Sequence, residues 1–288
     1  MRNPGSSVTR QILRFHSTAF VRRLLDKRRS ESALVEIRDF APELAFATNL
    51  STVADFYSAC FRLLKSDYRV EAVYKEALLN WWVNRSGNRA RSGVMFEMRV
   101  GASKLDALCV GRDSTAFEVK TSYDAPRRLA GQLVNYRVRF PKVFVIASES
   151  TVDKLIDYIP TGVGVMFLNS AGGLDLHTEA VVDAHWLDPK AMISVLRRAE
   201  LLHLSSSLGA DLRDTPNTRF LNEVASLVEQ LDPLLLSKLV SSRLLERTSA
   251  LSTQSLRALP QGLRSLAVGA GVTDKQFQDL GVVLSERI

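Results

Sequence analysis

The sequence predicts a mixed α/β protein whose β-strands are gathered in the middle of the chain. Short segments rich in β-branched and aromatic residues alternate with helical segments between residues 94 and 168. Amphipathic patterns close to the 3.6-residue period of a helix precede and follow this region. Together these observations favour a sheet-containing domain flanked by helical regions.

We predict three regions along the chain: an N-terminal helical region at 1–68, an α/β domain at 69–186 and a C-terminal helical region at 187–288. In the α/β domain we expect, in order, a helix at 71–83, strands at 94–100, 104–110 and 115–121, a helix at 126–140, a strand at 142–148, a helix at 151–159 and a strand at 163–168. In the last region we expect helices at 190–204, 216–231, 233–251 and 275–284. Their apolar faces could bury an interface with a second copy or a partner protein.

Apolar run lengths and the spacing of cysteines and histidines argue against several classes of protein. The longest apolar runs, 143–147 and 163–168, fall far short of the roughly 20 residues of a membrane helix, so we expect no membrane partner. The N-terminal segment lacks the apolar core of a secretory signal, and two cysteines suit a reducing compartment, which favours the cytoplasm. The spacing of the two cysteines and four histidines argues against a Cys/His zinc module.

Positive charge is concentrated around the predicted sheet. The net charge is +7, and from residue 85 to residue 139 eleven Lys/Arg face five Asp/Glu. This excess favours a polyanionic partner, although a solubilising surface would have the same composition.

Three charged residues occupy two of the predicted strands. Glu118 and Lys120 are two residues apart in 115-TAFEVKT-121, so both point to one face of the strand. Alone, this pair is typical of a solvated strand face. Asp106 is harder to explain in this way, because 104-KLDALCV-110 carries aliphatic residues on both faces. A hairpin turn at Gly111 would bring Asp106 close to Glu118.

Two neighbouring carboxylates repel unless a cation lies between them. Oxygen ligands of this kind suit Mg²⁺ or Mn²⁺, which keep several waters and bind phosphate oxygens. Lys120 could then orient or deprotonate the attacking water, or stabilise the charge that grows on the phosphate.

The helix after Pro126 adds a polar stripe. Arg128, Gln132 and Tyr136 are four residues apart and share one helical face, whereas Leu129 and Leu133 form an apolar edge that would pack on the sheet. A solvated helix face is the alternative interpretation.

These residues resemble the PD-(D/E)XK nuclease superfamily, in particular its RecB-like branch with a Q-x-x-x-Y helix. The matching positions are Asp106, the E-x-K at 118–120 and Gln132-x-x-x-Tyr136. The phrases 96-FEMRVGASKLDAL-108, 117-FEVKTSYDAPRRL-129 and 258-ALPQGLRSL-266 also resemble an uncharacterised bacterial family of such proteins. Leu105 stands where the superfamily name has proline, a departure that the RecB-like branch tolerates.

The resemblance implies a restriction-endonuclease-like α-β-β-β-α-β core with a mixed sheet. It also implies a divalent-metal-dependent nuclease activity, with DNA favoured over RNA as the substrate. Bacterial defence or DNA processing would be its biological role. It implies that Lys120 is the catalytic lysine and that Gln132 and Tyr136 shape the site. The implied metal ligands are Glu76, Asp106, Glu118 and the carbonyl of Val119. Glu71 and Glu97 are further candidates for a carboxylate ligand.

Five arginines are candidates for contacts with nucleic acid phosphates, with solvated surface as the alternative: Arg89, Arg91, Arg127, Arg128 and Arg137. Two other functions stay open at this point. One is a catalytically silent nuclease fold that binds nucleic acid or a partner protein, and the other is an RNA-cleaving enzyme with the same chemistry.

Overall fold

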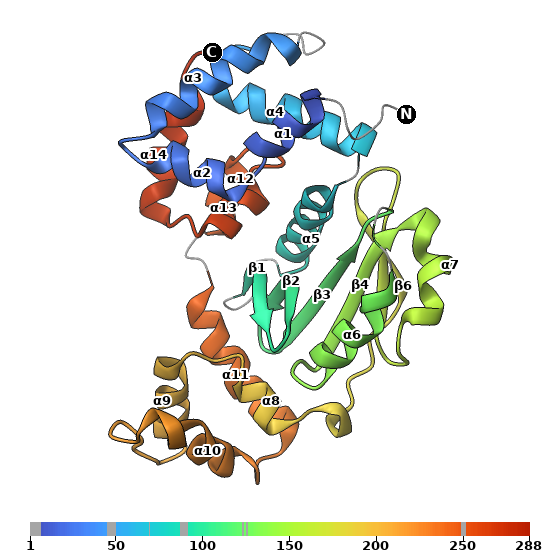
Figure 1. Ribbon diagram of the computed structural model, residues 1–288, viewed down its shortest axis with the longest axis vertical. Helices are drawn as coiled ribbons and strands as arrows, with labels where there is room; N and C mark the ends of the chain where they lie inside the picture. The colour runs from blue at the N-terminus through green and yellow to red at the C-terminus, as the bar shows by residue number, and fades with distance from the viewer. Residues whose placement is uncertain are drawn as a thin grey trace. The chain divides into compact units, whose positions relative to one another are not determined.

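Six strands form one mixed sheet in the computed structural model of the protein (Figure 1). The strands are β1 (Gly93–Val100), β2 (Ser103–Val110), β3 (Ser114–Lys120), β4 (Lys142–Ser148), β5 (Gly164–Leu168) and β6 (Leu174–Thr178). They lie in the order β1-β2-β3-β4-β5-β6. The pairings β1·β2, β2·β3 and β5·β6 are antiparallel, whereas β3·β4 and β4·β5 are parallel. The α/β class is thus confirmed, with helices flanking the sheet.

The structure describes residues 7–44, 50–68, 70–86, 92–122, 124, 126–248 and 252–288. They fall into two compact units. The sheet unit comprises residues 86–170 and 174–248, and the helical unit comprises residues 1–85, 171–173 and 249–288.

The predicted hairpin joins β2 to β3. Val110 pairs with Ser114, so the turn contains only Gly111, Arg112 and Asp113, and the Gly111 N–H donates to the Asp113 carbonyl at 3.0 Å. A turn this short ties the two strands into one register, which decides which of their side chains face each other.

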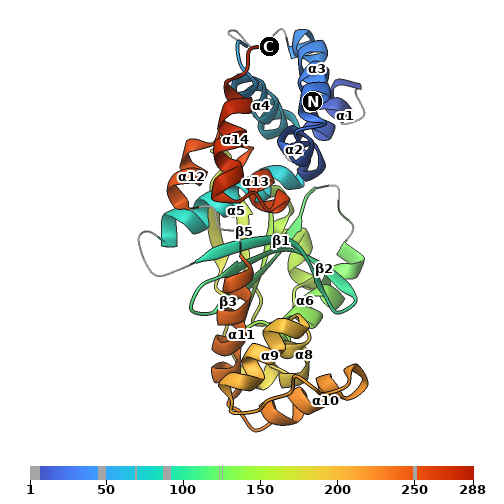
Figure 2. The ribbon, with the colours of Figure 1, turned by 90° about the vertical axis from the view of Figure 1, so that its left-hand side faces the viewer.

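Helices cover the sheet and close the core of the sheet unit. They are α6 (Leu129–Arg137), α7 (Val152–Leu155), α8 (Pro189–Ile193), α9 (Arg198–Ser207), α10 (Asn217–Val228) and α11 (Pro233–Arg247), with 3-10 turns η3 (Pro126–Arg128), η4 (Glu149–Thr151), η5 (Ile156–Tyr158) and η6 (Ala184–Trp186). Leu129 and Leu133 of α6 are buried in a cluster with strand residues such as Leu105 and Val145, as predicted. α11 contacts β2 and β3 (Figure 2). The hydroxyl groups of Ser241 and Ser114 share a hydrogen bond.

The helical unit holds the N-terminal helices and the last three helices of the chain. Its elements are α1 (Ser7–Phe15), α2 (Thr18–Leu25), α3 (Ser30–Phe40), η1 (Ala41–Leu44), α4 (Val53–Leu63), η2 (Leu64–Tyr68), α5 (Glu71–Ser86), α12 (Thr253–Ala258), α13 (Arg264–Ala270) and α14 (Asp274–Ser285). Rings of Phe15, Phe20, Phe40 and Phe56 meet in its core, mostly edge to face. Thr52 and Asp55 form a capping box at the start of α4.

These compact units differ from the three predicted regions. Helices α8 to α11 belong to the sheet unit, because buried residues such as Leu236, Val240 and Leu244 join the core under the sheet. Residues 252–288 belong to the helical unit, where α13 contacts α2 and α14 contacts α2 and α4. Neighbours in sequence therefore bury their apolar faces against segments far along the chain.

Several elements were predicted differently. α12 and α13 were not expected, and the helix predicted at 151–159 is the short helix α7 between two 3-10 turns. β6 was not expected, because four of its five residues are exposed and its sequence LDLHT lacks the apolar alternation of a half-buried strand. The helix predicted at 190–204 is two helices, α8 and α9, with a break at 194–197. Among the described residues, no helix is long and apolar enough to cross a membrane.

The buried His16 makes the stability of the helical unit depend on pH. Its ring packs near Tyr57 and Phe61, and burial lowers its pKa to about 4. Because the pKa is lower in the folded chain than in the unfolded chain, the unfolded chain binds more protons as pH falls.

We therefore expect the free energy of unfolding to drop by about 2 kcal/mol through His16 between pH 7.5 and pH 5. Urea titrations at both pH values test this. The His16→Phe variant should lose that part of the pH dependence, and replacing the exposed His203 with Phe should leave it unchanged. An unaltered pH dependence in His16→Phe would contradict the prediction.

Candidate active site

Glu118 and Lys120 are buried on the central part of the sheet. All seven residues of β3 are buried, and the side chains of Glu118 and Lys120 are only 2% and 11% exposed. The solvated strand face, which the E-x-K pattern alone would favour, is therefore wrong. Ionised groups in such a place require partners, because unpaired burial of charge is costly.

Lys120 has two such partners. Its ammonium donates to Glu118 Oε1 at 2.8 Å and to Gln132 Oε1 at 3.1 Å. The second oxygen of Glu118, Oε2, accepts from the Tyr136 hydroxyl at 3.0 Å. Both oxygens of the Glu118 carboxylate are thus engaged, which holds its orientation.

Helix α6 positions Gln132 and Tyr136 next to Lys120 and Glu118. Tyr136 is buried with Leu129 and Leu133, whereas Gln132, one turn before Tyr136, is only partly buried and reaches Lys120. The Tyr136 hydroxyl also lies 3.1 Å from the carbonyl oxygen of Lys104, an alternative acceptor on β2. Arg128, the third member of the predicted stripe, is exposed.

Asp106 comes from the neighbouring strand. Ala107 pairs with Phe117, so continuing the same register brings Asp106 opposite Glu118. Asp106 Oδ2 accepts from the Val119 N–H at 2.7 Å. The five residues predicted to form the site therefore lie on β2, β3 and α6. Hydrogen bonds join Glu118, Lys120, Gln132 and Tyr136, and Asp106 is held by the Val119 N–H between Glu118 and Lys120.

The electrostatics of this group follow from burial. Burial raises the pKa of Glu118, and the Lys120 cation and the hydrogen bonds from Lys120, Tyr136 and Gln132 oppose that rise. The pKa of Tyr136 is raised by burial first and then by the negative charges of Glu118 and Asp106. Tyr136 therefore stays protonated and donates its hydrogen bond to the carboxylate.

The oxygen atoms of Asp106 and Glu118 suit a divalent ion. Within the described ranges, no group of three or more His, Cys, Asp or Glu residues could hold a metal. Mg²⁺ needs no such group, because it commonly binds one or two carboxylates and completes its shell with waters and phosphate oxygens. Carboxylate oxygens are the type of donor that Mg²⁺ or Mn²⁺ prefers. The ligand roles of Asp106 and Glu118 stay a prediction. A ligand role for the Val119 carbonyl stays a prediction.

The other predicted carboxylates have partners of their own. Glu76, on α5 in the helical unit, is buried, and its Oε2 accepts from the Ser265 N–H at 3.0 Å. Burial raises its pKa, and hydrogen bonds from Ser265 and Gly262 oppose that rise. Glu71 pairs with Lys75 at 2.6 Å. Their roles as ligands stay predictions.

Glu97 has an unusual backbone next to the site. It lies between Phe96, which pairs with Ala107, and Met98, which pairs with Leu105, so it falls opposite Asp106. Its φ of 59° is left-handed, a conformation that costs free energy for a residue with a side chain. Its carboxylate pairs with Lys104 at 2.6 Å. Lys104 was not among the predicted site residues. The sequence feature that could have indicated it is its position two residues before Asp106, which places both side chains on the same face of the strand.

The predicted phosphate-binding arginines differ in their surroundings. Arg127 and Arg128 are exposed at the start of α6, whereas Arg137 lies over the Trp186 ring at 3.6 Å from its centroid. Burial lowers the pKa of Arg137, opposed by the charge of Asp183. Arg137 therefore has a packing role that the sequence did not indicate. Arg89 and Arg91 lie outside the described residues.

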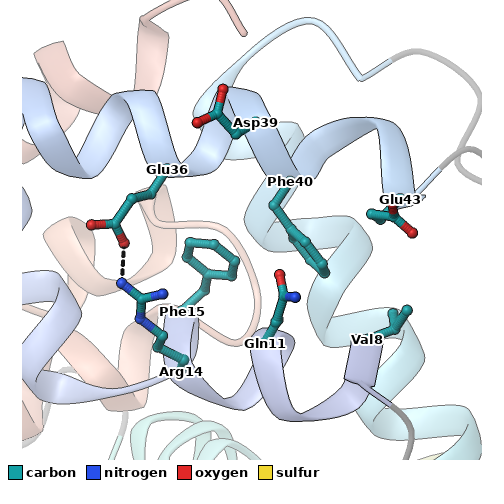
Figure 3. Close-up of a pocket in the computed structure, with 8 residues that line it drawn as sticks. All are labelled: Val8, Gln11, Arg14, Phe15, Glu36, Asp39, Phe40 and Glu43. Carbon is teal, nitrogen blue, oxygen red and sulfur yellow. Dashed lines mark hydrogen bonds and ion pairs between the residues drawn. The ribbon is translucent and has the colours of Figure 1, made fainter.

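A pocket in the helical unit contains none of the predicted site residues. Its volume is about 400 Å³, and it lies between α1, α3 and η1 (Figure 3). Arg14 and Glu36 form an ion pair in its wall. The lining residues are Val8, Gln11, Arg14, Phe15, Glu36, Asp39, Phe40 and Glu43. With three carboxylates and one guanidinium, this pocket has the wrong charge for a phosphate substrate.

The buried Lys120–Glu118 pair should contribute far more to stability than an exposed pair. In Lys120→Met, the Glu118 carboxylate loses its cation while still buried, so we expect the free energy of unfolding to fall by about 3 to 5 kcal/mol. Lys104→Met is the matched control, because Lys104 and Glu97 form the same type of pair with 61% and 49% of their side chains exposed. Its loss should stay below about 1 kcal/mol.

Urea unfolding followed by circular dichroism measures both losses. Adding Glu118→Gln to Lys120→Met should recover part of the stability, because the glutamine is uncharged and can still accept from Tyr136. Equal losses of unfolding free energy in Lys120→Met and Lys104→Met would show that the buried pair contributes no more to stability than the exposed pair.

Comparison with known proteins places the chain in a family. No curated protein matches it significantly. Among solved structures, the SPO1766 protein of unknown function from Silicibacter pomeroyi is similar at 14% identity and a TM-score of 0.30, over 43% of this chain and 86% of that one. The model of the family described as bacteriophage P4 protein cII matches residues 64–264, which is more than half of the chain. The chain belongs to the bacteriophage P4 protein cII family.

Proposed function

We propose that this protein is a divalent-metal-dependent nuclease that hydrolyses phosphodiester bonds, with DNA as its preferred substrate. The observation that carries the proposal is the buried Glu118–Lys120 pair, held by Gln132 and Tyr136 beside Asp106. The chain order α5-β1-β2-β3-α6-β4 supports a restriction-endonuclease-like core, because it repeats the α-β-β-β-α-β order of that fold.

Each residue of the group has a chemical role in this proposal. Asp106 and Glu118 would hold the ion, which when bound polarises the scissile phosphate. Lys120 would turn its ammonium from Glu118 toward the phosphate, where it stabilises growing negative charge or orients the attacking water. Gln132 would keep Lys120 in reach, and Tyr136 would keep Glu118 aligned through its hydrogen bond.

The proposal is tested by incubating the protein with single- and double-stranded DNA and RNA in Mg²⁺, Mn²⁺ or EDTA. We expect cleavage with either metal and none in EDTA. Asp106→Asn and Lys120→Met should lower the rate at least about a hundredfold, because the first removes a ligand of the ion and the second removes the ammonium that acts on the phosphate. Circular dichroism at the assay temperature checks that both variants are folded.

The matched controls change the same residue types at exposed positions of the sheet unit. Asp113→Asn alters the β2–β3 turn, and Lys142→Met alters the start of β4, so both should cleave at the wild-type rate. Cleavage in EDTA, or equal rates in all variants, would overturn the proposal. Tight binding without cleavage would identify a binding module instead, and cleavage of RNA alone would reassign the substrate.

Arg127 and Arg128 should contribute to binding through nucleic acid phosphates. A phosphate contact releases counterions, so each lost contact flattens the plot of log affinity against log salt by about 0.9. We expect Arg127→Ala and Arg128→Ala each to flatten it by about this amount in EDTA. Arg137→Ala should instead lower the melting temperature, since it removes the contact with Trp186. An unchanged slope in the first two variants would exclude them as phosphate contacts.

A further inference from the structure

A dense run of cations lies between α2 and α3 in the helical unit. Of the eight residues in 22-RRLLDKRR-29, five are Lys or Arg and one is acidic, far above the proportion in the whole chain. We propose that Lys27, Arg28 and Arg29, here termed the basic turn, form a second contact for the phosphates of nucleic acid. This inference rests on the proposed nuclease function and adds a binding surface outside the candidate active site.

The other two cations of the run have partners within the helical unit. Arg23 pairs with Glu36 at 2.6 Å, and Arg22 donates to the carbonyl oxygens of Gly269 and Ala270 at 3.2 Å. These contacts connect α2 to α3 and α13. Arg22 and Arg23 therefore have a structural role that accounts for their charge.

The basic turn has no comparable role. All three side chains are exposed. In the part of the chain that the structure describes, the side chains of Lys27 and Arg28 have no hydrogen bond or ion pair, and Arg29 reaches Asp26 only at 3.7 Å in an exposed pair. An exposed pair at that distance contributes little to stability. The three charges are thus available to a ligand.

One cation of the basic turn, Arg29, is also placed unfavourably for the fold. The basic turn directly precedes α3, and the N-terminus of a helix carries partial positive charge that disfavours nearby cations. Arg29 occupies the N-cap position of α3 but makes no capping hydrogen bond with its side chain. Lys27 directly follows the C-cap of α2, where a cation is favourable, so the unfavourable position is that of Arg29 alone.

The neighbouring side chains identify the class of ligand. No large apolar side chain between Arg22 and Ser30 is among the exposed ones of the described residues. A membrane-binding or protein-binding surface would bring apolar or aromatic groups next to its cations. A purely ionic surface matches the sugar–phosphate backbone, which is recognised mainly through charge.

Equilibrium binding of the full chain to a labelled DNA duplex, in EDTA over a KCl series, tests the inference. The variant Lys27→Ala/Arg28→Ala/Arg29→Ala should lose at least about tenfold in affinity at moderate salt, and its salt slope should flatten by about 2 to 3. The control Arg62→Ala/Arg257→Ala/Lys275→Ala removes the same charge from exposed positions of the same unit. Its affinity should stay within about twofold of the wild type.

Three results would overturn the inference: equal losses in the two triple variants, an unchanged affinity in the basic-turn variant, or no DNA binding by the wild type. Sedimentation with phosphatidylserine vesicles adds a further arm, and a loss of vesicle binding with unchanged DNA binding would assign the basic turn to lipid. Binding without cleavage would contradict only the proposed nuclease function, because the role of the basic turn is tested by DNA affinity and not by the cleavage rate.

Discussion

The ion pair between Lys120 and Glu118 is the interaction on which the sheet unit depends. Both residues lie on a strand that is buried along its whole length, where an unpaired charge would cost several kcal/mol. Their mutual hydrogen bond, the bond that Lys120 donates to Gln132 and the bond that Glu118 accepts from Tyr136 compensate for the lost hydration. A chain selected only for stability would more readily carry apolar residues at these two positions, because a buried ion pair rarely improves on a well-packed apolar pair.

Keeping this pair in place constrains the elements around it. β2 must pair with β3 in one register for Asp106 to face Glu118, and the three-residue turn after Val110 supplies that register. α6 must pack through Leu129 and Leu133 so that Gln132 and Tyr136 reach the charges. The left-handed backbone of Glu97, opposite Asp106, is a costly conformation that the surrounding sheet must hold in place.

The positive charge of the chain is divided between local structure and exposed surface. Arg137 stacks on Trp186, and Arg22 and Arg23 connect helices, so these cations are needed by the fold itself. Arg127, Arg128 and the basic turn extend into solvent, where cations are free to meet phosphates. Net charge alone could not make this distinction, because it depends on which carboxylates, carbonyls and rings lie within reach of each cation.

The sequence by itself determined the α/β class, five of the six strands and the proximity of Asp106 to Glu118, because strand periodicity and turn chemistry are local properties. The inclusion of Gln132 and Tyr136 in the site came from the resemblance to a nuclease superfamily. β6, an exposed edge strand without apolar alternation, could not be found in this way. Only the tertiary structure decided that Glu118 and Lys120 are buried and that α8 to α11 complete the sheet unit while the last helices join the first. Burial and the choice of packing partner depend on contacts between segments far apart in the chain, and a one-dimensional pattern does not contain them.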